Sequence, residues 1–522
     1  MANAPRDVAA AGAEAIDLPD EAATLALAAW MAAFARPGDF FALSGDLGAG
    51  KTAFARGFLR ALLDDPELEA PSPTFTLMQI YQGPEFPAVH ADFYRLRSAE
   101  ELAQLGWDEA IDGAVALVEW PDRAAAALPP DRIEIAFRFD LAEGPDFRRA
   151  EVSAFGALAA RFARARGVDR LLRRAGWAEA RRASLHGDAS TRAYERLTAV
   201  DGGTAVLMIS PPRAEGPILR YGKSYAAIAR LSPDIRAFLA MAEGLRGLGY
   251  STPRIFAASV ADGLALIEDF GAQTIAGEKG AIAARYAEAT ELLADLHGRA
   301  LPQTLPVDGG TYAPPVYDIE AMLVEVELAV EWYAPTTRGP LSSGARAQFL
   351  ALWRQLLAPI LAEPVTWTLR DYHSPNLHWL PERRGFRRIG LIDFQDATLG
   401  PPAYDLASLL QDARVEVPDE LELRLIAAYT RRRAAADASF DASAFAASYA
   451  AMGAQRATKI LGLFARLDKR DGKPQYLKHL PRVERRLARN LAHPLLEPLK
   501  LWYQTHLPRP LGDADALPQS SA

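Results

Sequence analysis

One stretch decides the fold of the N-terminal part of this chain: Gly45-Asp46-Leu47-Gly48-Ala49-Gly50-Lys51-Thr52. A short apolar run at 39–44 precedes it, and residues 53–63 follow with the apolar spacing of a helix. Between a strand and a helix, such a glycine-rich turn presents backbone N–H groups to the phosphates of a nucleotide. The sequence therefore predicts a P-loop in an α/β domain, with further strands at 76–81, 88–93, 114–119 and 132–139 and a helix at 99–105.

The residue types of this region suggest roles in nucleotide binding. Lys51 is expected to reach the β- and γ-phosphates, and the Thr52 hydroxyl is expected to bind Mg²⁺. Asp92 and Glu119 each end an apolar strand run, where a carboxylate can meet the metal or orient water. For each of them a cap at a strand end is the alternative. Close main-chain contacts to the nucleotide are expected along the loop, from Gly45, Asp46, Gly48, Ala49 and Gly50.

Four segments together resemble TsaE, the ATPase subunit of the bacterial tRNA threonylcarbamoyladenosine machinery: the P-loop, Ser72-Pro73-Thr74-Phe75-Thr76, His90-Ala91-Asp92-Phe93-Tyr94-Arg95-Leu96 and Val118-Glu119-Trp120-Pro121. The resemblance covers nearly all of residues 15–157. It implies a small ATPase that works with the threonylcarbamoyl-transfer proteins on adenosine 37 of tRNA. It also implies that Lys51 and Glu119 serve catalysis, that Thr52 and Glu119 hold Mg²⁺, that the Thr74 segment is a switch and that Asp92 supports the phosphate site.

The charge of this part is strongly acidic. Residues 1–157 hold 12 Lys and Arg against 26 Asp and Glu, a net charge of −14, while the whole chain carries −8. Because neutralising nucleic-acid phosphates requires Lys and Arg, this balance argues against direct RNA binding by the first domain. A role in tRNA chemistry would then depend on protein partners.

A second constellation lies near the C-terminus: Asp371-Tyr372-His373-Ser374-Pro375-Asn376, followed by Asp393. A kinase that phosphorylates a hydroxyl needs a carboxylate to accept the proton and oxygen ligands for Mg²⁺. At the spacing of a kinase catalytic loop, Asp371 is the candidate base, and Asn376 and Asp393 are candidate metal ligands. The apolar run 389–392 places Asp393 at a strand end. The alternative is that these residues are structural, serving as a helix cap and as an aspartate in a turn.

The elements around this constellation suggest two lobes. A hairpin at 185–197 and 204–209, a helix at 233–248 and a strand at 264–269 precede a stretch that is mostly helical after residue 281. Strands first and helices afterwards predict an α+β two-lobed, protein-kinase-like domain with a cleft between the lobes.

This part resembles the aminoglycoside phosphotransferase-like kinases, and more narrowly the anomeric N-acetylmuramate and N-acetylglucosamine kinases of cell-wall recycling (AmgK-like). The resemblance spans roughly 168–505 and implies ATP-dependent phosphorylation of the anomeric hydroxyl. The loop 187–194 resembles the nucleotide-covering loop, with Ser190, Thr191 and Arg192 as nucleotide contacts, and Glu268 and Phe270 resemble the hinge beside adenine. The matching motifs are Leu369-Arg370-Asp371-Tyr372-His373-Ser374-Pro375-Asn376-Leu377, Ile392-Asp393-Phe394-Gln395-Asp396-Ala397 and Gly400-Pro401-Pro402-Ala403-Tyr404-Asp405-Leu406.

Two residues depart from the broader kinase pattern. Leu369 stands where many relatives have His, and Met208 stands where a phosphate-pairing Lys is expected on the third strand. The candidates to replace that Lys are Arg192, Lys223 and the metal ions; a solvated loop residue is the plainer interpretation of Lys223.

Two basic segments remain. Eight arginines between 156 and 182 predict a solvated linker helix, with docking to RNA or an acidic face as the alternative. Residues 456–489 contain eleven Lys and Arg and only three acidic residues. A solvated helical face is the favoured interpretation there, and an anionic substrate or RNA is the alternative.

The chain of 522 residues exceeds what one core usually serves. We expect a P-loop domain at 1–157, a basic linker at 158–169, a kinase-like domain at 170–510 and a tail at 511–522. With no cysteine, disulfides, thiolate nucleophiles and Cys-bound zinc are excluded. The absence of a recognisable leader or membrane span favours the cytoplasm.

These features predict a bifunctional enzyme that uses ATP and Mg²⁺: an ATPase for tRNA modification fused to an amino sugar kinase. One alternative for the second half is a kinase for an aminoglycoside, choline or a pentose. Another is a nucleotide-binding regulatory or scaffold protein, because the third-strand Lys is absent. Specificity for the sugar depends on the shape of a pocket in the helical lobe, and the sequence does not give that shape.

Overall fold

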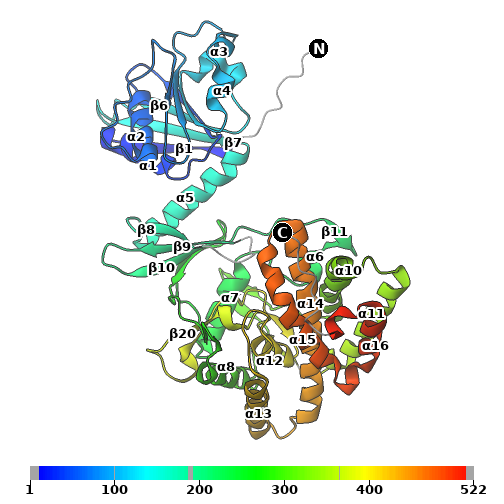
Figure 1. Ribbon diagram of the computed structural model, residues 1–522. Helices are drawn as coiled ribbons and strands as arrows, with labels where there is room; N and C mark the ends of the chain where they lie inside the picture. Colours follow the sequence, from blue (N-terminus) through cyan, green and yellow to red (C-terminus); the bar gives the residue numbers. More distant parts are fainter. Residues whose placement is uncertain (1–10, 99, 186–191, 364, 513–522) are drawn as a thin grey trace. The chain divides into compact units, whose positions relative to one another are not determined.

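The computed structural model describes residues 11–98, 100–185, 192–363 and 365–512. It divides the chain into two compact units, Met1–Arg170 and Leu171–Ala522 (Figure 1). Among the described residues, the structure has no helix with the length and apolar character needed to cross a bilayer.

A seven-stranded sheet forms the centre of the first unit, with the order β1-β7-β6-β2-β5-β4-β3. Strand β2 runs parallel to its neighbours β5 and β6, while β1, β7 and β3 add antiparallel edges. The bounds are β1 Ala11–Leu18, β2 Phe40–Gly45, β3 Met78–Tyr81, β4 Ala88–Asp92, β5 Val115–Glu119, β6 Arg132–Phe139 and β7 Arg148–Phe155. The strands predicted from apolar runs are confirmed with small shifts at their ends.

Both faces of this sheet are covered. Phe41 and Leu43 of β2 pack with helices α1 (Glu21–Ala32) and α2 (Lys51–Leu63), while Phe40 and Ala42 pack with α4 (Trp107–Ile111) and its neighbour α3 (Glu100–Gln104). Because successive strand residues face opposite sides, a strand buried on both faces reads as one apolar run. This burial fixes the P-loop between the end of β2 and the start of α2.

Helix α5 (Ala157–Ala175) carries most of the arginines that predict a solvated linker. Its Leu158 and Phe162 belong to the apolar core of the first unit. Arg161 pairs with the buried carboxylate of Asp39. The first half of this helix therefore packs on the first unit, because its apolar residues recur at helical spacing between the arginines.

The second unit begins with a five-stranded antiparallel sheet of the order β13-β14-β10-β9-β8. Its bounds are β8 Arg181–Leu185, β9 Ala193–Thr198, β10 Thr204–Ile209, β13 Ile255–Ser259 and β14 Leu264–Glu268. The predicted hairpin of 185–197 with 204–209 is confirmed only from residue 193 on, as the pair β9–β10, in which Tyr194 lies opposite Met208. Leu185 ends the separate strand β8, and residues 186–191 lie outside the described part of the chain. Helix α7 (Arg236–Gly247) packs its apolar face in the same core as Met208.

Helices make up most of the rest of the unit, as expected (Figure 1). The longest, α14 (Ala442–Asp471), contacts α9 (Ile319–Leu328), α12 (Ala403–Leu410) and α15 (Leu480–Leu491). The other helices are α6 Tyr225–Ile228, α8 Ala283–Leu296, α10 Ala334–Thr337, α11 Ser343–Leu361, α13 Asp419–Ala436 and α16 Glu497–His506. Short strand pairs complete the unit: β11 Ile218–Arg220 with β12 Lys223–Ser224, β15 Ala276–Gly277 with β16 Gly280–Ala281, and β17 Leu305–Val307 with β18 Gly310–Tyr312.

Two further short sheets position the catalytic loop. Strand β19 (Thr366–Thr368) pairs with β22 (Thr398–Gly400), and β20 (Leu377–Trp379) pairs with β21 (Ile389–Leu391). In the second pair Leu377 lies opposite Leu391, and the N–H of Ile392 donates to the carbonyl of Asn376 at 3.1 Å. This register brings Asn376 beside Asp393.

Two candidate nucleotide sites

The P-loop of the first unit holds the conformation that phosphate binding needs. Gly45, Gly48 and Gly50 have φ values of 132°, 77° and 111°, a region that favours glycine. A Cβ at Gly45 would lie 2.3 Å from the carbonyl oxygen of Phe137, so a side chain is excluded there. Gly50 precedes α2 without a side-chain cap, which leaves the first amides of that helix for an anion.

Lys51 folds back onto this loop. Its Nζ donates to the carbonyls of Gly45 and Asp46, each at 2.8 Å, and lies 4.0 Å from the ring centre of Trp120. Burial lowers the pKa of Lys51, against the opposing effect of Glu119, Asp92 and Asp46. The ammonium group is therefore held beside the loop amides by main-chain oxygens.

Thr52 and Glu119 meet at the end of the central strands. The Thr52 hydroxyl lies 2.9 and 3.0 Å from the two carboxylate oxygens of Glu119. His90 Nε2 lies 3.0 Å from Oε1 of the same carboxylate. A half-buried hydroxyl and a buried carboxylate at this place are the kind of oxygen ligands that Mg²⁺ takes.

Asp92 ends β4, the strand next to β5, and accepts hydrogen bonds from the segment that resembles a switch. Its Oδ2 accepts a hydrogen bond from Thr74 Oγ1 at 2.8 Å and another from Ser72, and its Oδ1 accepts from the N–H of Tyr94 at 2.9 Å. Asp92 and Glu119 are 3% and 2% exposed, so neither is a surface cap.

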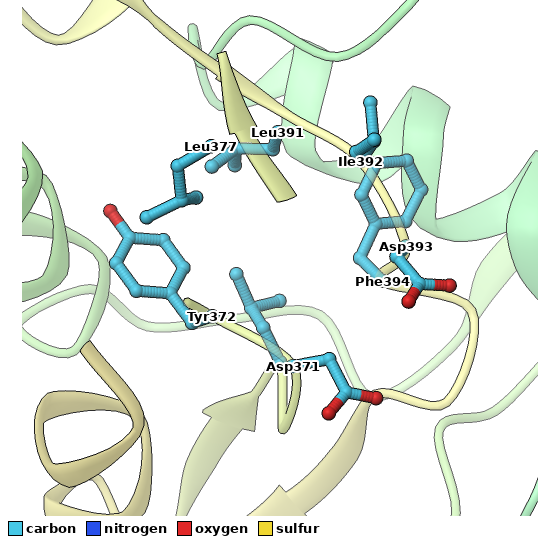
Figure 2. Close-up of a pocket in the computed structure, with 8 residues that line it drawn as sticks. Asp371, Tyr372, Leu377, Leu391, Ile392, Asp393 and Phe394 are labelled. Atoms are coloured by element: carbon cyan, nitrogen blue, oxygen red, sulfur yellow. The ribbon is translucent and has the colours of Figure 1, made fainter. Parts of the chain in front are cut away.

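In the second unit the structure brings Asp371, Asn376 and Asp393 together. The side-chain amide of Asn376 donates to the carbonyl of Asp371 at 3.0 Å and to Oδ2 of Asp393 at 3.2 Å. Figure 2 shows the carboxylates of Asp371 and Asp393 on the same side of the apolar side chains that line the cavity beneath them. A carboxamide oxygen and a carboxylate beside a second carboxylate fit a kinase magnesium site.

The two carboxylates differ in their electrostatic surroundings. Burial favours the neutral form of Asp371, but the charges of His373, Lys459 and Arg456 outweigh it and lower its pKa. Burial and the charge of Asp371 raise the pKa of Asp393, although Arg192 opposes this. Asp371 is thus the more acidic group of the pair.

Arg192 lies on the side of Asp393. Its Nη1 is 2.9 Å from Oδ1 of Asp393 and its Nη2 is 3.8 Å from Oδ2 of Asp396. Met208 is 1% exposed and packs in the core, so the third strand offers no cation at that position. Lys223 is exposed on β12.

Glu268 and Phe270 line a cavity of about 300 Å³ formed by residues 268–273 and 379–383. Arg383 forms an ion pair with Glu268 at 2.5 Å and lies 5.2 Å from the ring centre of Phe270. An aromatic side chain that lines a cavity of this size suits a flat base such as adenine. The candidate contacts Ser190 and Thr191 lie outside the described residues.

Sequence reasoning missed the buried groups that hold the catalytic loop. Asp405 accepts hydrogen bonds from the N–H groups of Leu369 and Arg370 at 2.6 and 2.8 Å. The Arg370 side chain pairs with Glu325, which also binds Lys459 at 2.7 Å. Asp405 lies within a quoted motif, whereas Glu325 gives no sequence signal because its partners are distant in the chain.

One further expectation can be compared with the structure. The solvated face expected at 456–489 is wrong for Arg456 and Arg486, each 6% exposed. Both point into polar networks inside the helical lobe, where buried carbonyls and carboxylates receive them.

Comparisons with known proteins match both parts of the chain. The family model described as "Threonylcarbamoyl adenosine biosynthesis protein TsaE" matches residues 18–145, and the model described as "Phosphotransferase enzyme family" matches residues 181–439. The predicted order, a P-loop NTPase-like domain followed by a phosphotransferase domain, is confirmed.

Curated relatives agree with these matches. An N-acetylmuramate/N-acetylglucosamine kinase of Caulobacter vibrioides is 40% identical over 345 residues, which cover 64% of this chain and 94% of the relative. A kinase of the same name from Neisseria meningitidis is 33% identical over 324 residues, 58% of this chain and 85% of the relative. The tRNA threonylcarbamoyladenosine biosynthesis protein TsaE of Rickettsia prowazekii is 42% identical over 100 residues, 19% of this chain and 69% of the relative.

Proposed function

Because the chain belongs to the TsaE family through its first unit and to the N-acetylmuramate/N-acetylglucosamine kinase family through its second, we propose that it is a bifunctional cytoplasmic enzyme. Its second unit phosphorylates the anomeric hydroxyl of an N-acetylated amino sugar. Its first unit hydrolyses ATP in support of tRNA threonylcarbamoylation. ATP with Mg²⁺ is the cofactor pair of both families.

In the kinase site, Asp371 accepts the proton of the sugar hydroxyl. An ionised carboxylate within hydrogen-bonding reach of the acceptor contributes typically about 10²- to 10⁴-fold to such a transfer. Asn376 and Asp393 would hold Mg²⁺, which would neutralise charge on the phosphoryl group that ATP donates. The contact between Asn376 and Asp393 at 3.2 Å is the observation that carries this assignment.

Arg192 takes the place of the missing third-strand Lys in this proposal. Arg192 directly precedes β9, in which Tyr194 lies opposite Met208, and its side chain reaches Asp393 at 2.9 Å. Arg192 therefore brings a cation to this site from the start of the neighbouring strand. The cavity beside Glu268 and Phe270 holds the base.

In the first unit, the loop amides of residues 45–50 and Lys51 hold the phosphates. Thr52 and Glu119 would hold Mg²⁺, and Asp92 with Thr74 would sense the nucleotide. The acidic charge of this unit favours action through the threonylcarbamoyl-transfer proteins over direct contact with tRNA.

The proposal is tested by phosphate transfer from ATP across a panel of N-acetylmuramate, N-acetylglucosamine, aminoglycosides, choline and pentoses. We expect the wild-type protein to transfer phosphate to the N-acetylated sugars. Transfer only to another compound of the panel would favour the alternative acceptor class. No transfer to any compound, with nucleotide binding intact, would favour the regulatory or scaffold function.

A further inference from the structure

A buried glutamine lies two residues after the candidate metal ligand Asp393. Gln395 is 3% exposed, and its side-chain Nε2 donates to Oδ1 of Asp393 at 2.6 Å. Burying an amide costs free energy unless its hydrogen bonds are satisfied, and here the bond goes to a carboxylate of the candidate site. The proposed mechanism gives this amide no role so far.

The backbone around Gln395 is held by contacts with the rest of the unit. The N–H of Ala397 donates to the carbonyl of Phe394 at 3.1 Å, so Gln395 lies inside a hydrogen-bonded turn. The ring of Phe394 stacks on that of Phe238 in helix α7, with 5.2 Å between the ring centres. A turn that packing fixes in this way presents the amide of Gln395 to Asp393.

Both oxygens of the Asp393 carboxylate accept hydrogen bonds. Oδ1 accepts from Gln395 and from Nη1 of Arg192 at 2.9 Å, and Oδ2 accepts from the side-chain amide of Asn376 at 3.2 Å. A carboxylate offers about four lone-pair directions, so these donors leave one, and it belongs to Oδ2. The side chain of Asp393 is 36% exposed, so a ligand can reach the carboxylate.

Asp393 needs such support, because its surroundings disfavour a charged carboxylate in this conformation. Its φ of 59° costs free energy in residues other than glycine. Burial and the charge of Asp371 raise the pKa of Asp393, whereas the charge of Arg192 and the hydrogen bond from Gln395 lower it. Arg192 is a cation and repels a metal ion at the same carboxylate. The amide of Gln395 is neutral, so it can hold Asp393 while a metal ion is bound.

We propose that Gln395 is a positioning residue for the metal site of the second unit: it holds Oδ1 of Asp393 and thereby leaves Oδ2, beside Asn376, for the metal ion. The proposal rests on the proposed kinase function. Gln395 acts through Asp393 and touches neither the sugar nor the reacting atoms. Hydrogen-bond partners of metal ligands typically contribute about 10- to 100-fold to metal affinity.

The test titrates a non-hydrolysable ATP analogue onto the full-length protein by calorimetry, once with Mn²⁺ and once with EDTA. Mn²⁺ prefers the same oxygen ligands as Mg²⁺. Every protein carries Lys51→Ala, so that the P-loop does not contribute. Gln395→Met, which keeps the length but not the donor, is expected to weaken binding with Mn²⁺ by roughly 10- to 100-fold and to leave binding with EDTA unchanged. Gln395→Glu should lose at least as much, because it turns a carboxylate toward Asp393.

The matched control is Gln411→Met. Gln411 is also a buried amide of the second unit, 6% exposed, and it donates to Asn490 at 3.1 Å. Its loss should leave binding unchanged with Mn²⁺ and with EDTA. Gln395→Asn, whose amide is too short to reach Asp393, replaces Gln395→Met in the test if that variant does not fold.

The Mg²⁺ dependence of phosphate transfer gives a second readout. Gln395→Met should raise the Mg²⁺ concentration at half-maximal rate, while kcat at saturating Mg²⁺ and KM for the sugar stay close to the wild-type values. A role confined to the fold would not produce this separation.

Three results would overturn the proposal. Unchanged binding of Gln395→Met with Mn²⁺ would show that Asp393 needs no help from the amide. Equal losses with Mn²⁺ and with EDTA would make Gln395 a structural residue of the turn, and tighter binding by Gln395→Glu would make position 395 a metal ligand itself. If the wild-type protein transfers phosphate to no compound of the panel, the kinase proposal fails, whereas the titrations still decide the role of Gln395.

Discussion

Asp371 is a partly buried carboxylate whose pKa is lowered, because the positive charges around it outweigh the effect of its burial. The pKa of Asp393, which follows β21, is raised, and the charge of Arg192 opposes this. In the proposed mechanism these different surroundings separate the proton acceptor from a metal ligand. Both Arg370 and Asp393 have positive φ values, 67° and 59°, a strained conformation that is common at catalytic sites.

Asp371→Asn should reduce phosphate transfer by about 10²- to 10⁴-fold, because the amide cannot accept the proton. Nucleotide binding should persist, since Asn376 and Asp393 remain. Initial rates and a nucleotide titration measure the two effects. Undiminished transfer would rule out Asp371 as the base.

Arg192→Gln should weaken ATP binding by roughly 10- to 100-fold, as expected for a lost hydrogen bond to a charged group. Adenosine, which has no phosphates, should bind the variant and the wild-type protein equally well. Arg182→Gln, in a surface pair with Glu195 on the same sheet, is the control. A parallel loss of adenosine affinity would show that Arg192 acts on the fold and not on the phosphates.

His373 makes the stability of the second unit depend on pH. Burial lowers the pKa of His373 from its ordinary value of 6.5 to about 4. Between these values the unfolded chain binds a proton that the folded chain does not, so the free energy of unfolding falls as the pH falls. Urea denaturation at a series of pH values should show a shallower fall for His373→Gln than for the wild type. Identical slopes would contradict the assigned shift.

The residues of the two candidate sites could be predicted from sequence, because Lys51, Thr52, Asp371, Asn376 and Asp393 stand at fixed spacings within short motifs. The residues that hold these side chains in place could not be predicted in this way. Glu325 and Lys459 are far apart in the chain, and the contact of His90 with Glu119 depends on the pairing of β4 with β5. Contacts of this kind follow from tertiary packing and leave no local pattern.

At the scale of elements, helices α9 and α14 approach closely at one glycine. A Cβ at Gly462 would lie 2.1 Å from the carbonyl carbon of Leu328 and 2.4 Å from the N of Ala329. This close packing fixes α14 against α9.

Gly462→Ala should therefore destabilise the second unit by about 1–3 kcal/mol, the usual cost of overpacking a core. Gly344→Ala, in helix α11 where the added methyl meets open space, should have little effect or a small stabilising one. Chemical denaturation of both variants measures the difference. An unchanged free energy of unfolding for Gly462→Ala would mean that the helices separate without cost.

Strands buried on both faces were predictable, whereas β1 and β7 were not. The sequence of β7, Arg148–Phe155, alternates apolar and charged residues and contains two adjacent arginines. Its partner β1 lies more than a hundred residues earlier. A strand that alternates apolar and charged residues, and that has one partner far away in the chain, resembles a loop until that partner is known.

At the scale of the whole molecule, two unrelated folds share one chain, and each has its own compact core. In the first unit, main-chain amides and one buried lysine form the candidate phosphate site. In the second unit, side-chain oxygens and Arg192 form the candidate phosphate site. Each set of groups is complete within its own unit, and this completeness is the basis for assigning two separate ATP sites.

The most direct test of two separate sites uses Lys51→Ala and Asp371→Asn, each in the full-length protein, with transfer to N-acetylmuramate and ATP hydrolysis without sugar measured side by side. We predict that Lys51→Ala loses the sugar-independent hydrolysis and keeps transfer, while Asp371→Asn loses transfer and keeps hydrolysis. Loss of both activities in either variant, or transfer that survives Asp371→Asn, would contradict the account.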